Sequence, residues 1–295
     1  MVCGFTEEPY PSSEEQLETI QCRFFECGSW KKGPELSASR AKAKAIVLND
    51  KLWVTGGYNV DFVDPEKDVA WLKSTELVSL DKSEPYIDLP VGLVRHCLAQ
   101  VNSRQIILTG GYGGEEGSKA FTGYGADGDF GWSKSTYLFN IQDKTWTNVG
   151  DLRVERDDHG CAAFLFDSTS VVVVAGGDSK RAVGTTVEFL RMDELSKGWQ
   201  MGAKLPWSLD RFSLLASPSE TSLLAVGGNS NGASGYTVEH ADTVLEMKCS
   251  SSLRNCEWKA LPEYLSSKRT DTVAMWLPKN LDLCHAGMNH ERNVL

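Results

Sequence analysis

The stretch KLWVTGGYN, from Lys51 to Asn59, ends a β-rich apolar run in two adjacent glycines. The same event recurs in IILTGGYGG, VVVVAGGDS and LLAVGGNSN. The four pairs are Gly56 and Gly57, Gly110 and Gly111, Gly176 and Gly177, and Gly227 and Gly228. They lie 54, 66 and 51 residues apart, and a regular long interval of this kind indicates a repeat architecture.

Two further markers follow the same period. An aromatic residue, followed by a short polar stretch and usually a Leu, stands at Trp30, Tyr86, Trp146, Trp199 and Trp258. An arginine shortly before the next apolar run stands at Arg40, Arg95, Arg156, Arg211 and Arg269. A similar segment also recurs between glycine pair and aromatic, as WLKSTELVSL and WSKSTYLFNI show. The markers together define one repeating unit.

Each unit contains about four short runs rich in β-branched and aromatic residues, separated by turn-forming residues, so it predicts four strands. The runs are too short for helices. Four-stranded units of roughly this length are typical of a β-propeller, in which each repeat forms one blade. The glycine pair then lies at the end of the second strand, where the chain turns sharply and needs a positive φ.

The paired glycines, the polar loop after them, the spaced Trp and the Arg before the next apolar run resemble the kelch repeat family. The resemblance covers the chain from about Thr19 to about Cys284. It implies an all-β kelch-type propeller, and it departs from the family's usual six blades. Kelch-like propellers include non-enzymatic interaction modules and some metal-dependent enzymes, so both classes of function are implied.

The markers predict how many blades there are. The aromatic and the arginine each occur five times and the glycine pair four times. The N-terminus supplies third and fourth strands (TIQCRFF, GSWKK), and the C-terminus a first strand (DTVAMWL) and a candidate second (LDLC). We therefore expect five blades, closed by joining the two ends in one blade; the alternative is an incomplete six-bladed ring. The predicted propeller spans 16–285, between tails at 1–15 and 286–295.

Eight cysteines bear on the compartment. Cys22 and Cys27 precede Trp30, and Cys249 and Cys256 precede Trp258, so each pair falls in a hairpin between third and fourth strands. Disulfides there would indicate an extracellular or secretory location; free thiols would indicate the cytoplasm. We expect a disulfide within each pair, although the lack of an apolar leader pattern and of any Asn-x-Ser/Thr sequon counts in favour of free thiols. Cys97 and Cys161 lie in first strands, where we expect buried packing.

Charge limits the partners. The formal net charge of −10 repels nucleic acid and anionic lipid, so a basic partner is electrostatically easier. No apolar run approaches the roughly 18 residues of a membrane helix, so we expect no membrane span.

The candidate binding face follows from strand direction. Loops after the glycine pairs and loops leading to the arginines lie at the same end of antiparallel blades, where a rigid scaffold presents binding residues. The aromatic candidates are Tyr58, Trp71, Tyr112, Tyr124, Phe130 and Trp132. Polar candidates follow the later glycine pairs at Asp178 and Asn229.

The arginines have two possible roles. Arg40, Arg156, Arg211 and Arg269 could ring the face and receive an acidic peptide, or they could tie adjacent blades together. The acidic loop residues would oppose an acidic ligand there: Asp61, Asp64, Glu66, Asp68, Glu115, Glu116, Asp127 and Asp129.

Catalytic chemistry has little support in the sequence. RDDHG places Asp157, Asp158 and His159 together, but neighbours on a strand point to opposite faces and should not converge on one ion. We expect His96 and His159 to be structural, and no cofactor. The sequence thus predicts a monomeric, non-enzymatic propeller that binds a protein or peptide partner; the alternative is a kelch-like metal-dependent enzyme with an unrecognised site.

Overall fold

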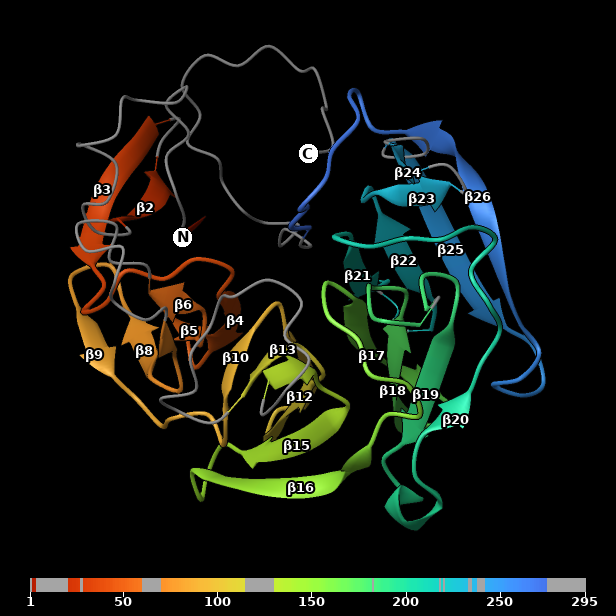
Figure 1. The fold of residues 1–295 in the computed structure, drawn as a ribbon, viewed down its shortest axis with the longest axis horizontal. Helices are drawn as coiled ribbons and strands as arrows, with labels where there is room; N and C mark the ends of the chain where they lie inside the picture. The colour runs from red at the N-terminus through yellow and green to blue at the C-terminus, as the bar shows by residue number, and fades with distance from the viewer. Residues whose placement is uncertain are drawn as a thin grey trace. The chain divides into compact units, whose positions relative to one another are not determined.

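The computed structural model describes residues 2–3, 21–26, 29–59, 70–114, 130–181, 183–217, 219, 221–232, 235–237 and 242–274. The chain divides into two compact units. The first unit comprises Met1–Val94, Gly113–Gly131 and Leu277–Val294, and the second comprises Arg95–Tyr112, Trp132–Trp276 and Leu295. Figure 1 shows the strands of both units.

The first unit contains one four-stranded antiparallel sheet, called sheet I. Its strands, in spatial order, are β4 (Lys44–Leu48), β5 (Lys51–Thr55), β8 (Thr75–Val78) and β9 (Ser83–Pro85). A second sheet contains β1 (Val2–Cys3), β2 (Gln21–Glu26) and β3 (Ser29–Glu35). The first unit also contains a hairpin of β6 (Tyr58–Asn59) and β7 (Ala70–Trp71), and the strand β10 (Gly92–Val94). The strands predicted near the N-terminus are therefore confirmed as β2 and β3.

The second unit contains three four-stranded antiparallel sheets. Sheet II contains β11 (Cys97–Asn102), β12 (Gln105–Thr109), β15 (Ser135–Asn140) and β16 (Thr145–Asp151). Sheet III contains β17 (Gly160–Phe166), β18 (Thr169–Ala175), β19 (Val187–Arg191) and β20 (Gln200–Met201). Sheet IV contains β21 (Ser213–Ala216), β22 (Leu223–Val226), β25 (Thr243–Cys249) and β26 (Cys256–Tyr264). The predicted four-stranded repeat is confirmed in all three.

The remaining elements are short. β23 (Ser230–Gly232) and β24 (Gly235–Thr237) form a hairpin after the fourth glycine pair. β13 (Tyr112–Gly114) and β14 (Phe130–Trp132) lie where the sequence passes between the two units. Within the described ranges the only helical element is a single 3-10 turn, η1 (Leu195–Lys197), so the fold is all-β.

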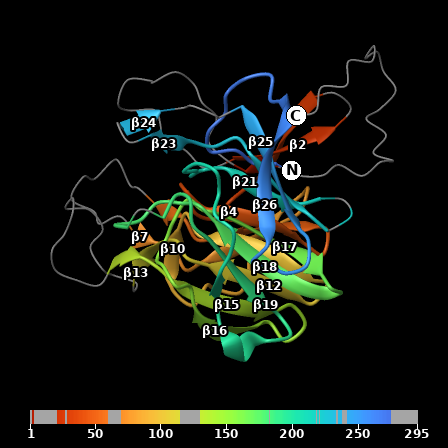
Figure 2. The ribbon, with the colours of Figure 1, turned by 90° about the vertical axis from the view of Figure 1, so that its right-hand side faces the viewer.

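Sheet III is covered on both faces, which explains its uninterrupted valine run. Successive side chains of a strand point to opposite faces. Val172 and Val174 enter a cluster with Ile107 of sheet II, while Val171 and Val173 enter a cluster with Leu223 of sheet IV. A strand between two apolar surfaces needs no polar alternation. In Figure 1, β17, β18 and β19 lie side by side between the strands of sheet II and those of sheet IV, and Figure 2 shows the same strands from another side.

The glycine pairs adopt the conformation that the sequence predicts. All eight glycines have a positive φ, for example 57° at Gly110 and 99° at Gly111. A Cβ on Gly110 would lie 2.5 Å from the carbonyl oxygen of Arg156. The N–H of Gly111 donates to that same oxygen at 2.8 Å. The turn therefore joins the end of the second strand of sheet II directly to the segment that enters sheet III.

Two of the repeating tryptophans in the second unit each join their sheet to the sheet before it. Trp199, next to the last strand of sheet III, donates from Nε1 to Thr136 Oγ1 of sheet II at 3.1 Å and is almost fully buried. Trp258, in the last strand of sheet IV, donates to the carbonyl of Ala203, just after sheet III, at 3.1 Å. Trp146 instead packs within its own sheet against Phe139, with ring centroids 4.8 Å apart.

The segment predicted as a C-terminal first strand is only partly described. Its four described residues, 271–274, are not in a strand, but Thr272 and Ala274 contact sheet IV. Thr272 Oγ1 donates to the carbonyl of Val226 at 2.9 Å, and the N–H of Ala274 donates to Ser213 Oγ at 2.8 Å. LDLC lies outside the described residues.

Candidate functional site

The arginines that precede the first strands occupy two different positions. The second glycine of successive pairs donates to the carbonyls of Leu93, Arg156, Leu209 and Arg269, which makes these four residues equivalent. Arg95 and Arg211 stand two residues further along, each with a positive φ (53° and 54°). The expected single series of five arginines is therefore wrong, because an offset of two residues separates its members.

Arg40 and Arg156 are buried ties within their own sheets. Arg156 donates to the carbonyl of Gly176 at 2.8 Å and pairs with Glu188 of β19 at 2.5 Å, and both side chains have no exposed surface. Arg40 likewise donates to the carbonyl of Gly56 at 3.0 Å and pairs with Glu76 of β8 at 2.9 Å. Neither residue can receive a peptide, and neither tie joins adjacent sheets. Both roles predicted for them are corrected.

Arg95 and Arg211 instead join the segments that enter the three sheets of the second unit. Arg95 Nη1 lies 3.2 Å from Asp157 Oδ2, and its Nε lies 3.5 Å from Asp158 Oδ2. Arg211 Nε lies 3.3 Å from the same Asp158 oxygen and 3.7 Å from Asp210 Oδ1. The arginine side chains are 33% and 29% exposed, whereas the three carboxylates are buried. A shared carboxylate thus connects sheets II, III and IV at their entries.

Asp157 and Asp158 both contact the guanidinium of Arg95, while His159 does not join them. The physical reason is the backbone of Asp158, which has a φ of 48° and lies just before β17 rather than within a strand. His159 turns away, with Nε2 2.9 Å from Thr109 Oγ1 in a buried contact. Its predicted structural role is confirmed.

The polar residues after the later glycine pairs complete the group. Asp178 and Asp157 form a backbone bridge with N–H to carbonyl distances of 3.0 and 2.9 Å, and Asn229 bridges Asp210 in the same way. Asn229 Nδ2 also donates to Asp210 Oδ1 at 3.3 Å. The two kinds of loop therefore lie at the same end of the sheets, as predicted. We call this group the strand-entry cluster: Arg95, Asp157, Asp158, Asp178, Asp210, Arg211 and Asn229.

Two buried carboxyl groups of the cluster, those of Asp157 and Asp210, hold protons more tightly than usual. Burial raises the pKa of Asp157 to about 6, the charge of Asp158 adds to this, and Arg95 opposes it. Burial also raises the pKa of Asp210 to about 6, against the opposing effects of Arg211 and Asn229. The internal arginines thus compensate only part of the cost of keeping these carboxylates ionised.

Two of the predicted aromatic residues border the cluster. Trp132 Nε1 donates to Asp157 Oδ1 at 3.2 Å, and the Tyr112 ring meets the Trp132 ring edge to face at 5.4 Å. Lys180 Nζ lies 6.0 Å from the centre of the Trp132 ring, at the outer limit of a cation–π contact. Both rings are only partly buried. They place an aromatic surface beside buried negative charge.

Other predicted binding residues lie elsewhere. Tyr58 and Trp71 face each other in the β6–β7 hairpin of the first unit, and Trp71 packs so closely on Gly92 that a Cβ there would lie 2.6 Å from its carbonyl oxygen. Arg269 has an exposed side chain and contributes its carbonyl to the glycine turn. Tyr124, the Phe130 side chain and the eight acidic loop residues lie outside the described residues.

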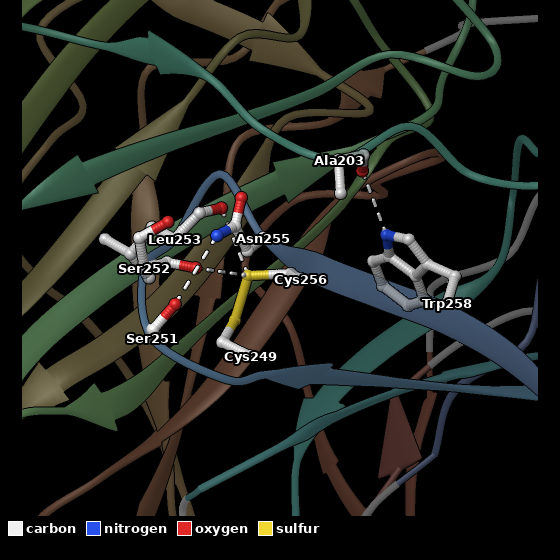
Figure 3. Close-up of a disulfide and its surroundings, with 8 residues drawn as sticks. All are labelled: Ala203, Cys249, Ser251, Ser252, Leu253, Asn255, Cys256 and Trp258. Carbon is white, nitrogen blue, oxygen red and sulfur yellow. Dashed lines mark hydrogen bonds between the residues drawn. A yellow bond between two sulfur atoms is a disulfide. The ribbon is translucent and has the colours of Figure 1, made fainter.

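One predicted disulfide is confirmed. Cys249 and Cys256 face each other in β25 and β26 and are bonded (Figure 3). The close-up also shows the loop between them and the Trp258 bond to Ala203. The Cys256 sulfur lies 3.1 Å from the Leu253 carbonyl oxygen, a contact without a proton because the sulfur is oxidised. Cys22 lies in β2 and Cys27 outside the described residues, so that pair stays a prediction.

A second disulfide corrects the expectation for the first strands. Cys97 of β11 and Cys161 of β17 are bonded to each other across sheets II and III, with Cα atoms 5.9 Å apart. The sequence showed two isolated cysteines in apolar strands, 64 residues apart. Only the stacking of the two sheets brings them together.

Comparison with known proteins identifies the fold alone. No family model and no curated protein matches the sequence. A solved structure titled "Structure of YjhT" matches with a TM-score of 0.56 and 13% identity, over 79% of this chain and 72% of that one. In the described part of the chain, no group of three His, Cys, Asp or Glu residues is placed to hold a metal ion, and no helix is suited to crossing a membrane. The chain has an all-β, propeller-type fold.

Proposed function

We propose that this protein is a non-enzymatic interaction module, a kelch-type propeller that binds a protein or peptide partner at the strand-entry cluster. Five blades, closed by joining the chain ends, agree best with the spacing of the repeat markers; an incomplete six-bladed ring is the alternative. The repeat within sheets II, III and IV supports this reading, since each has the same glycine turn and strand order.

The chemistry of the cluster favours a basic side chain of the partner. The cluster contains four carboxyl groups and two guanidinium groups, and the three carboxyls that pair with these guanidiniums are buried. A lysine or arginine from outside would supply the charge that the internal arginines leave uncompensated. This surplus of buried carboxylates is the observation that carries the proposal.

The aromatic border adds contact area of the kind that binding surfaces use. Trp132 and Tyr112 are rigid, partly exposed and fixed against each other. The stem of a bound lysine or arginine would lie on these rings while its charge reaches Asp157. The whole chain's charge of −10 also favours encounter with a basic partner.

The two disulfides in the described residues support an extracellular setting for this binding. Disulfides at two different places in the stack, one between sheets and one within a hairpin, fit an oxidising environment better than a reducing one.

The test is binding of a short oligolysine peptide, measured by calorimetry at low salt and about neutral pH. We expect the Asp157→Asn/Asp158→Asn variant to bind at least about tenfold more weakly than the parent, a loss of roughly 1.4 kcal/mol. An oligoglutamate peptide should not bind measurably.

The control separates the cluster from the general charge of the chain. The Asp151→Asn/Asp143→Asn variant removes the same formal charge from an exposed strand and an exposed turn of sheet II. It should retain the parent's affinity. Equal losses of affinity in both variants would mean that oligolysine binding depends only on the net charge of the chain, and the proposed site would be wrong.

A further inference from the structure

We propose that the Cys97–Cys161 disulfide is the positioning element of the strand-entry cluster: by bonding β11 to β17 it holds Arg95 against Asp157 and Asp158. The disulfide thereby sets the charge that the face presents to a partner. This inference rests on the proposed function for its biological meaning, although its chemical content can be tested without any partner.

The bond stands directly behind the ion pairs. Cys97 is two residues from Arg95, and Cys161 is three residues from Asp158, so the bond closes a short path between cation and anions. The N–H of Asp158 also donates to the carbonyl of Arg95 at 3.2 Å. These two links, one covalent and one polar, hold the entries of sheets II and III together on either side of the charged side chains.

The contact between sheets III and IV shows which interaction occupies the place of the disulfide there. By strand register, the positions of Cys97 and Cys161 correspond, one sheet later, to Gly160 and Leu214. There Gly160 fits so closely against Leu214 and Phe212 that a Cβ would lie 2.7 Å from each of them. Close apolar packing therefore fixes the entries of sheets III and IV, whereas a covalent bond fixes those of sheets II and III.

Arg95 depends on such a constraint more than a buried arginine does. Its guanidinium is one-third exposed and meets its two carboxylates at 3.2 and 3.5 Å. Its backbone has a φ of 53°, a conformation that non-glycine residues adopt only where the surroundings impose it. Freed from β17, the segment would relax and carry the guanidinium into water.

The effect would appear at Asp157. The charged groups that act on it are Arg95, which favours its ionised form, and Asp158 and Asp178, which oppose it. Arg211 reaches the same group through Asp158, and Arg211 itself is influenced by Asp210, Asp271 and Arg95. Within the described residues, Arg95 is the only one of these cations that forms an ion pair with Asp157. Its withdrawal leaves Asp157 buried beside two carboxylates.

The experiment follows the Asp157 carboxyl carbon by NMR through a pH titration of the whole chain. The test variant is Cys97→Ser/Cys161→Ala, because Ser213 and Ala45 occupy the corresponding positions in sheets IV and I. We expect the Asp157 midpoint to move upward by about one pH unit, the usual effect of losing an adjacent opposite charge. The control is Cys249→Ser/Cys256→Ser, which removes the other disulfide and should leave the midpoint in place.

A second variant keeps the disulfide and removes the cation. Arg95→Gln should raise the Asp157 midpoint by a similar amount in the parent and by much less in the Cys97→Ser/Cys161→Ala protein, since the two changes act through one contact. An unchanged midpoint in either Arg95→Gln or a folded Cys97→Ser/Cys161→Ala variant would overturn the proposal, as would full additivity of the two shifts. If the cysteine variant does not fold, the same titration is made on folded Cys249→Ser/Cys256→Ser protein before and after reduction of the Cys97–Cys161 bond, and an unchanged midpoint would equally overturn the proposal. Failure here leaves oligolysine binding intact, so the two proposals fail separately.

Discussion

Asp157 and Asp210 each keep a carboxyl group almost fully out of water, beside an arginine that remains partly in it. An ionised carboxylate in such a place lowers the stability of the fold, and buried groups of this kind are typical of functional sites. The same surroundings allow Asp158 to form ion pairs with two arginines that precede strands of different sheets. The cluster is therefore better described as a shared negative charge than as four separate ion pairs.

The raised pKa predicts how stability depends on pH. Because the folded state holds the Asp157 proton up to about pH 6 and the ordinary value is 3.8, this group stabilises the fold below about pH 4 and loses that contribution as pH rises through 6. Asp157→Asn removes the dependence. We expect the unfolding free energy of the variant, relative to the parent, to improve by up to about 3 kcal/mol between about pH 4 and pH 7.5.

Urea denaturation at a series of pH values provides the measurement. Asp151→Asn, on the exposed strand β16, is the control for the loss of one charge and should show no comparable trend. A difference between Asp157→Asn and the parent that stays constant with pH would contradict the assigned pKa.

Among the elements, the turn after each second strand is the most constrained. Gly110 needs both a positive φ and room, because the Arg156 carbonyl lies 2.5 Å from the place of a Cβ. Gly198 has nearly the same φ, 62° against 57°, but no atom within 4 Å of its Cβ position. Substitutions at Gly198 therefore measure the cost of backbone strain alone, whereas substitutions at Gly110 also measure the cost of the close contact.

Gly110→Ala should therefore lower the unfolding free energy by more than about 1 kcal/mol beyond the loss in Gly198→Ala. Thermal and urea unfolding of both variants measure the difference. Equal losses would show that glycine is required at position 110 only for its backbone conformation. The close approach of Gly110 to the segment that enters the next sheet would then contribute nothing to the requirement.

The elements were largely predictable from the sequence, while the side-chain geometry at their ends was not. Short apolar runs between turn residues identify strands such as β5 and β18, since local composition determines them. The sequence pattern did not predict the offset between Arg95 and Arg156, because both residues lie just before an apolar strand. The offset becomes visible only when Glu188 is seen to pair with Arg156, a partner 32 residues away.

For the whole molecule, the disulfides decide where a partner should be sought. A peptide map of protein from its native source, after rapid alkylation and without reduction, should contain Cys97 linked to Cys161 and Cys249 linked to Cys256. Both links are expected because each pair meets across neighbouring strands or sheets in the folded chain. Alkylated thiols at all four positions would contradict the extracellular setting.

The stack of sheets also shows why the Cys97–Cys161 bond could not be predicted. Hairpin cysteines such as Cys249 and Cys256 are close in sequence, so the turn itself predicts their contact. Cys97 and Cys161 belong to different repeats, and their contact depends on how one sheet lies on the next. Sequence periodicity predicts the repeat but not the register between neighbouring repeats.

The direction of the tryptophan bonds has a consequence for synthesis of the chain. Trp199 and Trp258 each reach from the end of one repeat to the repeat before it. A nascent sheet therefore keeps its Thr136 hydroxyl or Ala203 carbonyl without this partner until the last strand of the following repeat has left the ribosome. During translation the repeats would therefore become stable one after another. Each new repeat would stabilise the sheet before it, and its own sheet would wait for the repeat that follows.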